Sequence, residues 1–121
     1  MLFLCYPKCD TCQKAKQWLD EKSVAYTLRD IKQDNPTADE LRGWHEASGL
    51  PLKKFFNTSG LLYKSMQLKD RLPLMSEEEQ ITLLASDGML IKRPILVYTS
   101  RVLMGFHEAE WKNVIEDREK S

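Results

Sequence analysis

The first thirty residues change their hydrophobic period twice. Residues 2–5 form an apolar run that stops before Pro7, as expected for a short buried strand. Residues 10–22 place apolar side chains at helical spacing among polar ones, and residues 25–29 alternate in the manner of a second strand. Strand, helix and strand within about thirty residues is the size of one βαβ unit, in which the two strands run parallel.

Helix signals dominate the middle of the chain. Residues 37–40 (Thr-Ala-Asp-Glu) and residues 76–79 (Ser-Glu-Glu-Glu) are capping boxes, in which a hydroxyl and a carboxylate satisfy the free amides at a helix start. Residues 57–60 (Asn-Thr-Ser-Gly) have the composition of a turn. Because no repeat, low-complexity tract or linker interrupts the chain, residues 32–90 are predicted to be a helical insertion within a single domain of residues 1–121.

The end of the chain returns to strands. Residues 95–98 and 102–104 are apolar runs joined by a tight connection, which predicts an antiparallel hairpin. Residues 107–119 place Trp111 and two aliphatic side chains on one face of a closing helix. The order βαβ, inserted helices, ββα predicts an α/β fold on a mixed four-stranded sheet.

Composition narrows the function classes. Hydrophobic residues make up 42% and charged residues 30%, as in an ordinary soluble protein, and 18 basic residues balance 18 acidic ones. A neutral chain has no bulk electrostatic attraction to nucleic acid or to an anionic membrane. No apolar run approaches the roughly 20 residues of a membrane span, and the start is too short for a signal peptide. We therefore expect a cytoplasmic protein, and the lack of heptads or a large apolar patch favours a monomer.

The three cysteines lie within the first twelve residues, at Cys5, Cys9 and Cys12. Cys9-Asp-Thr-Cys12 stands where the first strand passes into the first helix, which is the setting of a redox C-x-x-C motif. The helix N-terminus, with the amides of Asp10, Thr11 and Cys12, favours a thiolate. We expect Cys9 to be the nucleophile and Cys12, one turn further on, to be the resolving thiol.

Other interpretations of the cysteines and histidines have less support in the sequence. Tetrahedral zinc needs four ligands, and only Cys5, His45 and His107 could add to the motif, so a metal site is not expected. Cys5 lies in an apolar strand and is interpreted as a buried small hydrophobe. The two histidines are interpreted as structural or exposed.

Arg93-Pro94 precedes the strand at residues 95–98, which the topology places near the first strand. A guanidinium there could lie beside Cys9 and stabilise its thiolate or a bound oxyanion. A solvated arginine after Lys92 is an equal alternative from the spacing alone.

Taken together, four segments resemble the arsenate reductase / Spx family, a branch of the thioredoxin fold with a helical insertion. They are residues 9–15, 53–60, 83–95 and 102–106. The resemblance covers essentially the whole chain and implies a thioredoxin/glutaredoxin-like fold. It also implies that Pro94 is cis and faces the active site, and that Arg93 is the anion-stabilising arginine beside Cys9.

The resemblance also separates activities. Glutaredoxin-linked arsenate reductases have a serine at the position of Cys12 and three arginines around arsenate. In this chain only Arg93 matches, whereas Lys53 and Gly105 stand at the other two places. Arginine forks hold tetrahedral oxyanions well, so these departures argue against arsenate reduction.

Two functions from different classes remain. The first is a thiol–disulfide oxidoreductase that cycles Cys9 and Cys12, acts on a small thiol or disulfide substrate, and needs no cofactor beyond glutathione or another low-molecular-weight thiol as reductant. The second is a redox-sensing Spx-type regulator that binds the C-terminal domain of the RNA polymerase α-subunit, through Lys14, Lys16 and the region of Ser48-Gly49. The short C-terminal tail favours the first, and a cysteine pair retained from an ancestral activity is a third alternative.

Overall fold

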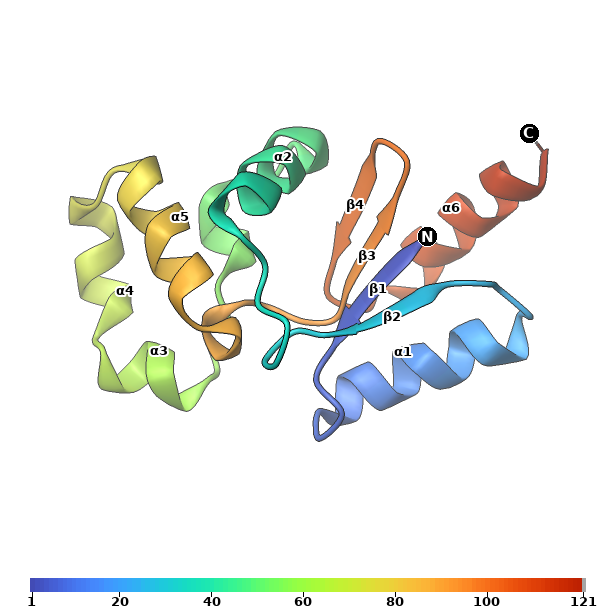
Figure 1. Cartoon of the computed structure of the whole chain (residues 1–121), viewed down its shortest axis with the longest axis horizontal. Helices are drawn as coiled ribbons and strands as arrows, with labels where there is room; N and C mark the ends of the chain where they lie inside the picture. The colour runs from blue at the N-terminus through green and yellow to red at the C-terminus, as the bar shows by residue number, and fades with distance from the viewer. Residues whose placement is uncertain (121) are drawn as a thin grey trace.

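The computed structural model describes residues 1–120, with the side chains of residues 1–117 (Figure 1). In chain order, with η for a 3-10 helix, the elements are β1 (Leu2–Cys5), α1 (Asp10–Glu21), β2 (Thr27–Asp30), α2 (Ala38–Ser48), η1 (Leu52–Phe55), α3 (Leu61–Ser65), α4 (Leu68–Arg71), η2 (Leu72–Leu74), α5 (Glu77–Ser86), η3 (Gly88–Leu90), β3 (Ile95–Tyr98), β4 (Arg101–Met104) and α6 (Glu108–Lys120). Within residues 1–120 no helix has the length and apolar character of a bilayer span.

The four strands form one mixed sheet in the order β2-β1-β3-β4. β1 pairs with β2 in parallel and with β3 antiparallel, and β3 and β4 form the antiparallel hairpin. The predicted α/β fold is therefore confirmed. The second strand begins at Thr27, two residues later than predicted, because Ser23 has a positive φ of 56° in a turn that is still leaving α1.

Alternation along β1 divides the core between the two faces of the sheet. Phe3 and Cys5 pack in a cluster with α1 and α6, which includes the buried Trp18 and Trp111. Leu4 points to the other face, into a cluster with α2 and the helices that follow it. Figure 1 shows α1 and α6 on one side of the sheet and the helices between β2 and β3 on the other.

Both predicted capping boxes are present, at Thr37 with Glu40 and at Ser76 with Glu79. The short helices α3 and α4, of five and four residues, were not predicted. Helices of this length show no hydrophobic period, and Gln67 between them has a positive φ of 55°. They are set by packing rather than by local pattern.

Gly88 begins η3, between α5 and β3. Its amide donates a hydrogen bond of 2.9 Å to Asn35 Oδ1, in the segment between β2 and α2. A Cβ atom at Gly88 would lie 1.9 Å from the Ile31 carbonyl oxygen. Only glycine therefore allows this approach of two backbone segments.

An ion pair ties β2 to the start of α2. The Arg29 guanidinium donates to both Glu40 carboxylate oxygens, at 2.7 and 2.9 Å, and its remaining donors reach the carbonyl oxygens of Asp34 and Asn35. The hydrogen bonds from Arg29 lower the pKa of Glu40 to about 2, against an ordinary value of 4.5. A bidentate pair of this kind is both directional and charge-assisted.

The Arg29–Glu40 pair predicts an acid-dependent contribution to stability. Because the pKa of Glu40 is lower in the folded protein, its contribution is present above pH 4.5 and is lost as the pH falls toward 2. We expect Arg29→Met to flatten the fall in unfolding free energy over this range, measured by urea denaturation at several pH values. Arg71→Met, at an exposed arginine on α4, is the matched control. An unchanged slope in Arg29→Met would contradict the assignment.

Candidate redox site

The C-x-x-C motif lies at the junction predicted for it. A turn closed by the Cys9 amide and the Tyr6 carbonyl oxygen, at 2.9 Å, carries the chain from β1 to α1. Cys9 is the N-cap of α1 and is partly exposed. Its sulfur therefore stands at the positive end of the helix dipole, where a thiolate is stabilised.

Cys12 is in a contrasting environment. Its side chain is completely buried, and the Tyr6 amide donates a hydrogen bond of 3.3 Å to its sulfur. The neighbouring Cys5 thiol, together with burial, raises the pKa of the Cys12 thiol far above its usual range, and the nearby Cys9 acts in the same direction. Cys12 is thus a protonated, shielded thiol next to an accessible one.

Cys5 is 3% exposed, which confirms that it is a buried side chain of the first strand. Its contact with Cys12 was not apparent from the sequence, because it depends on how α1 packs on β1. All three cysteines are free thiols in this structure.

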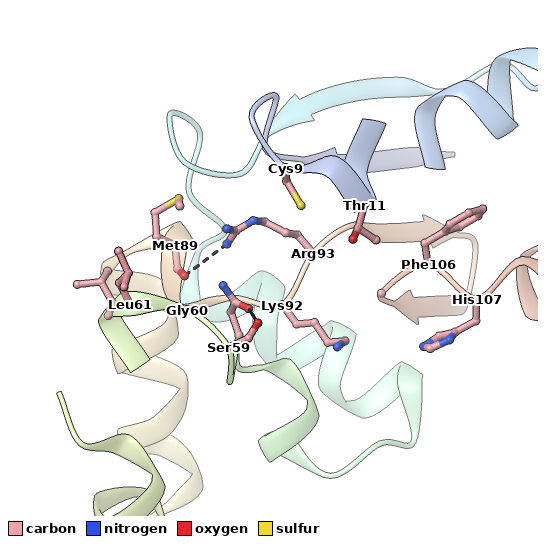
Figure 2. A pocket seen from close by; sticks show the side chains of 13 residues that line it. Cys9, Thr11, Ser59, Gly60, Leu61, Met89, Lys92, Arg93, Phe106 and His107 are labelled. Carbon is pink, nitrogen blue, oxygen red and sulfur yellow. Dashed lines mark hydrogen bonds between the residues drawn. The ribbon is translucent and has the colours of Figure 1, made fainter. Parts of the chain in front are cut away.

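A cavity of about 760 Å³ opens beside Cys9 (Figure 2). It is lined by four segments of the chain: Cys9 and Thr11; Asn57 and Ser59 to Leu62; Met89, Lys92 and Arg93; and Gly105 to His107. Figure 2 shows the Cys9 sulfur, the Thr11 hydroxyl and the Arg93 side chain around the same opening. Asp10 does not line the cavity and is exposed in the first turn of α1.

Arg93 reaches this cavity because β3 lies beside β1, with Ile95 opposite Leu4. The Arg93-Pro94 peptide bond is cis, which confirms the conformation inferred from the family resemblance. Pro94 is buried, and its carbonyl oxygen accepts a hydrogen bond of 2.8 Å from the Gly105 amide. The sheet therefore brings Arg93 and the cysteine loop together from opposite ends of the sequence.

The Arg93 guanidinium is only partly satisfied by the protein. It lies 5.3 Å from the centroid of the Tyr6 ring and donates long hydrogen bonds of 3.4 and 3.5 Å to the carbonyl oxygens of Met89 and Ile91. Its Nε is buried and has no hydrogen-bond partner among the described residues. An unsatisfied buried donor costs about 1–3 kcal/mol, which points to an acceptor supplied by a ligand.

The structure does not bring together the three positions at which arsenate reductases have arginines around arsenate. Lys53, expected at the second place, lines a separate cavity of about 410 Å³ together with His45 and Glu77. Lys53 lies in η1 and does not line the Cys9 cavity, so it does not share that opening with Arg93. Gly105, at the third place, does lie at the Cys9 cavity and has a positive φ of 76°.

Sequence reasoning missed several residues of the cavity. His107 is exposed, as one of its two interpretations expected, and it also lines the cavity, as do Asn57 and Lys92, which the sequence did not single out. The composition of residues 57–60 predicted a turn, but it did not show which other segments the turn would contact. His45 instead packs edge-on against Phe55 and lies 3.7 Å from a Glu77 carboxylate oxygen.

The comparison with family models decides the identity of the fold. The model of the ArsC family matches residues 4–114. The chain belongs to the ArsC family. Its mixed four-stranded sheet has the thioredoxin-like fold that the family resemblance implied.

Individual ArsC-family relatives are similar over nearly the whole length. YusI of Bacillus subtilis is 49% identical over 93% of this chain and 95% of its own. The crystal structure of an ArsC-family-related protein from Bacteroides fragilis superposes with a TM-score of 0.91 at 57% identity, covering 93% of this chain and 95% of that one. A candidate arsenate reductase from Streptococcus mutans gives a TM-score of 0.84 at 47% identity, covering 92% and 96%.

The proteins similar to this chain include a regulator as well as a candidate reductase. The global transcriptional regulator Spx of Staphylococcus aureus is 29% identical over 86% of this chain and 78% of its own. Similarity is therefore compatible with both kinds of protein, and the residues at the site must distinguish them.

Proposed function

We propose that this protein is a thiol–disulfide oxidoreductase that cycles Cys9 and Cys12 between dithiol and disulfide. The observation that carries the proposal is the asymmetry of the pair. Cys9 is accessible at a helix N-terminus and beside a cationic cavity, whereas Cys12 is buried, protonated and in contact with it. Nucleophilic and resolving thiols need these two environments.

The reaction consists of two exchanges. The Cys9 thiolate attacks one sulfur of a disulfide, whose S–S bond breaks, and one half leaves as a thiolate. Cys12 then loses its proton to solvent and attacks Cys9 Sγ, which releases the second half and leaves a Cys9–Cys12 disulfide. The substrate gains two electrons and the protein loses them. Two further exchanges with a low-molecular-weight thiol restore the dithiol.

Arg93 assists the first exchange electrostatically. Its guanidinium faces the same opening as the Cys9 sulfur (Figure 2), so it favours the thiolate of Cys9 and an anionic group next to the attacked sulfur. Thr11 and the free amides of the first turn of α1 act on the same charge. Pro94 positions Arg93 rather than touching the reacting atoms.

Arsenate reduction is not part of the proposal. Of the three expected oxyanion-binding places, Arg93 alone has an arginine at the cavity, since Lys53 lines a different one and residue 105 is glycine. A single guanidinium is weak support for a tetrahedral oxyanion that needs several bidentate donors.

The test is to oxidise the protein with oxidised glutathione and to map its disulfides by mass spectrometry. We expect a Cys9–Cys12 bond, because these two thiols are neighbours at the start of α1 and one of them is accessible. Cys5 should become alkylated only after unfolding, since it is 3% exposed. A bond that includes Cys5, or a stable Cys9–glutathione adduct with Cys12 free, would contradict the cycle.

A redox-switched regulator is the second candidate. It is favoured by the 29% sequence identity with Spx, which extends over 86% of this chain. The binding surface expected from the sequence needs revision. Lys14 and Lys16 lie on α1, whereas Ser48-Gly49 ends α2, and these helices pack on opposite faces of the sheet. Capture of the C-terminal domain of the RNA polymerase α-subunit in the oxidised or reduced state would support this candidate, and capture in neither would remove it.

A further inference from the structure

The cavity beside Cys9 has a one-sided charge. Three basic side chains line it, Arg93, Lys92 and His107, and no acidic side chain does so among the residues with described side chains. In a chain with 18 basic and 18 acidic residues, this local excess is not a consequence of overall charge. A cavity of one sign raises the local concentration of ligands of the other sign.

Lys92 and Arg93 serve different ends of this cavity. Figure 2 shows the Arg93 side chain directed toward Met89 and the Lys92 side chain directed toward His107. The Lys92 amide donates a hydrogen bond of 2.8 Å to the Phe55 carbonyl oxygen, which fixes the backbone from which both side chains leave. The two positive charges are therefore held apart.

Gly105 makes room for Lys92. A Cβ atom at residue 105 would lie 2.8 Å from Lys92 Cε, so any larger residue would displace the lysine. The same point lies 3.8 Å from Lys92 Nζ and 3.5 Å from His107 Nε2. Two nitrogen donors thus surround the bare face of this glycine, and the imidazole keeps at least one N–H in either protonation state.

The Lys92 ammonium group is available to bind an anionic ligand. It forms no ion pair with any described carboxylate, unlike Arg29 and Arg42, which are held by Glu40 and Glu78. Arg93 likewise has a buried Nε without a hydrogen-bond partner in the described part of the chain. Apolar side chains, including Leu62 and Phe106, line the rest of the cavity and suit the uncharged body of a ligand.

We propose that the cavity selects disulfides with an anionic group on each half. One anion lies on Arg93 beside the sulfur that Cys9 attacks, and the other lies between Lys92 and His107. Lys92 is then the residue that determines specificity for the leaving half. This inference rests on the proposed function for its chemistry, because Cys9 forms the new S–S bond and the second half departs as a thiolate.

The experiment compares two aromatic disulfides with the reduced protein. One is 5,5′-dithiobis(2-nitrobenzoate), with a carboxylate on each half, and the other is 4,4′-dithiodipyridine, with none. The rate constant of the first thiolate release is measured for both reagents. Each value is divided by the rate constant of 2-mercaptoethanol with the same reagent, which corrects for the intrinsic reactivity of that disulfide. We expect Lys92→Met to lower the preference for the dianionic reagent about three- to fivefold, the effect of a partly solvated ion pair, and to leave the neutral reagent within about twofold.

Two variants control for other effects. Lys54→Met removes the same charge from an exposed lysine outside the cavity and should retain the wild-type preference. Lys92→Arg keeps the charge and should restore it, which separates the subsite from a loss of folding. The proposal is overturned if Lys92→Met and Lys54→Met behave alike, if the preference is unchanged, or if Cys9 reacts with neither reagent.

The count of released thiolates distinguishes this inference from the proposed function. Two thiolates per protein mean that Cys12 resolves the mixed disulfide, as the cycle requires. One thiolate, with a charge preference that depends on Lys92, would contradict the cycle and support the subsite. Two thiolates without that preference would support the cycle and overturn the subsite.

Discussion

Replacing the Cys9 thiol with a hydroxyl, in Cys9→Ser, is expected to lower the rate of disulfide reduction by roughly a thousandfold or more. A serine at this position does not ionise at neutral pH, and loss of a covalent nucleophile typically removes most of the catalysis. The measurement is the release of thiolate from a low-molecular-weight disulfide in single-turnover conditions. In Cys12→Ser the first release should persist, but one thiolate rather than two should appear, because the mixed disulfide on Cys9 is not resolved.

Cys5→Ala is the matched control for the two serine variants. It removes the third thiol, which is buried and contacts Cys12 but does not line the cavity. We expect it to release two thiolates, as the wild type does. More than about a tenth of the wild-type rate in Cys9→Ser would show that another thiol attacks, and would end the assignment of Cys9 as nucleophile.

The largest expected effect on stability comes from Gly88→Ala. The added methyl group would lie 1.9 Å from the Ile31 carbonyl oxygen and 2.7 Å from Asn35 Oδ1, so the backbone itself must move. Overpacking that cannot be relieved by a side chain costs about 3 kcal/mol. Urea denaturation should report this loss of unfolding free energy. The contact between the residues after α5 and the segment after β2 should also shift.

Gly43→Ala provides the opposite control. Gly43 is an exposed residue of α2, and a Cβ there would meet nothing within 4 Å. Alanine is favoured over glycine in a helix interior by about 0.5–1 kcal/mol, so this variant should be slightly more stable than the wild type. Equal effects of the two substitutions would show that the close contact at Gly88 is absent in solution.

Local signals in the sequence predicted much of the fold. β1, α1 and the hairpin follow from hydrophobic period, and the starts of α2 and α5 follow from hydroxyl and carboxylate residues three positions apart. Such signals are reliable because the interactions behind them join residues that are only a few positions apart in the chain. The position of Cys9 at a helix N-cap is local in the same sense, and so was also predictable.

The composition of the cavity was not predictable in this way. His107, Asn57 and Lys92 come from three distant segments, and their meeting depends on how the insertion packs on the sheet. Lys53, which the resemblance sets at the place of a second arsenate-binding arginine, lines another cavity. Contacts across such distances leave no periodic trace in one sequence.

The Nε of Arg93, which no side chain or carbonyl oxygen of the described residues accepts from, makes ligand binding measurable by stability. The free protein keeps one desolvated N–H unsatisfied, and an anion that accepts from it removes that penalty in the folded state alone. Binding to the native state alone raises the unfolding free energy, by about 2.7 kcal/mol at a concentration one hundred times Kd. Melting temperature therefore reports anion binding without any electron transfer, so compounds can be screened on a Cys9→Ser protein that does no chemistry.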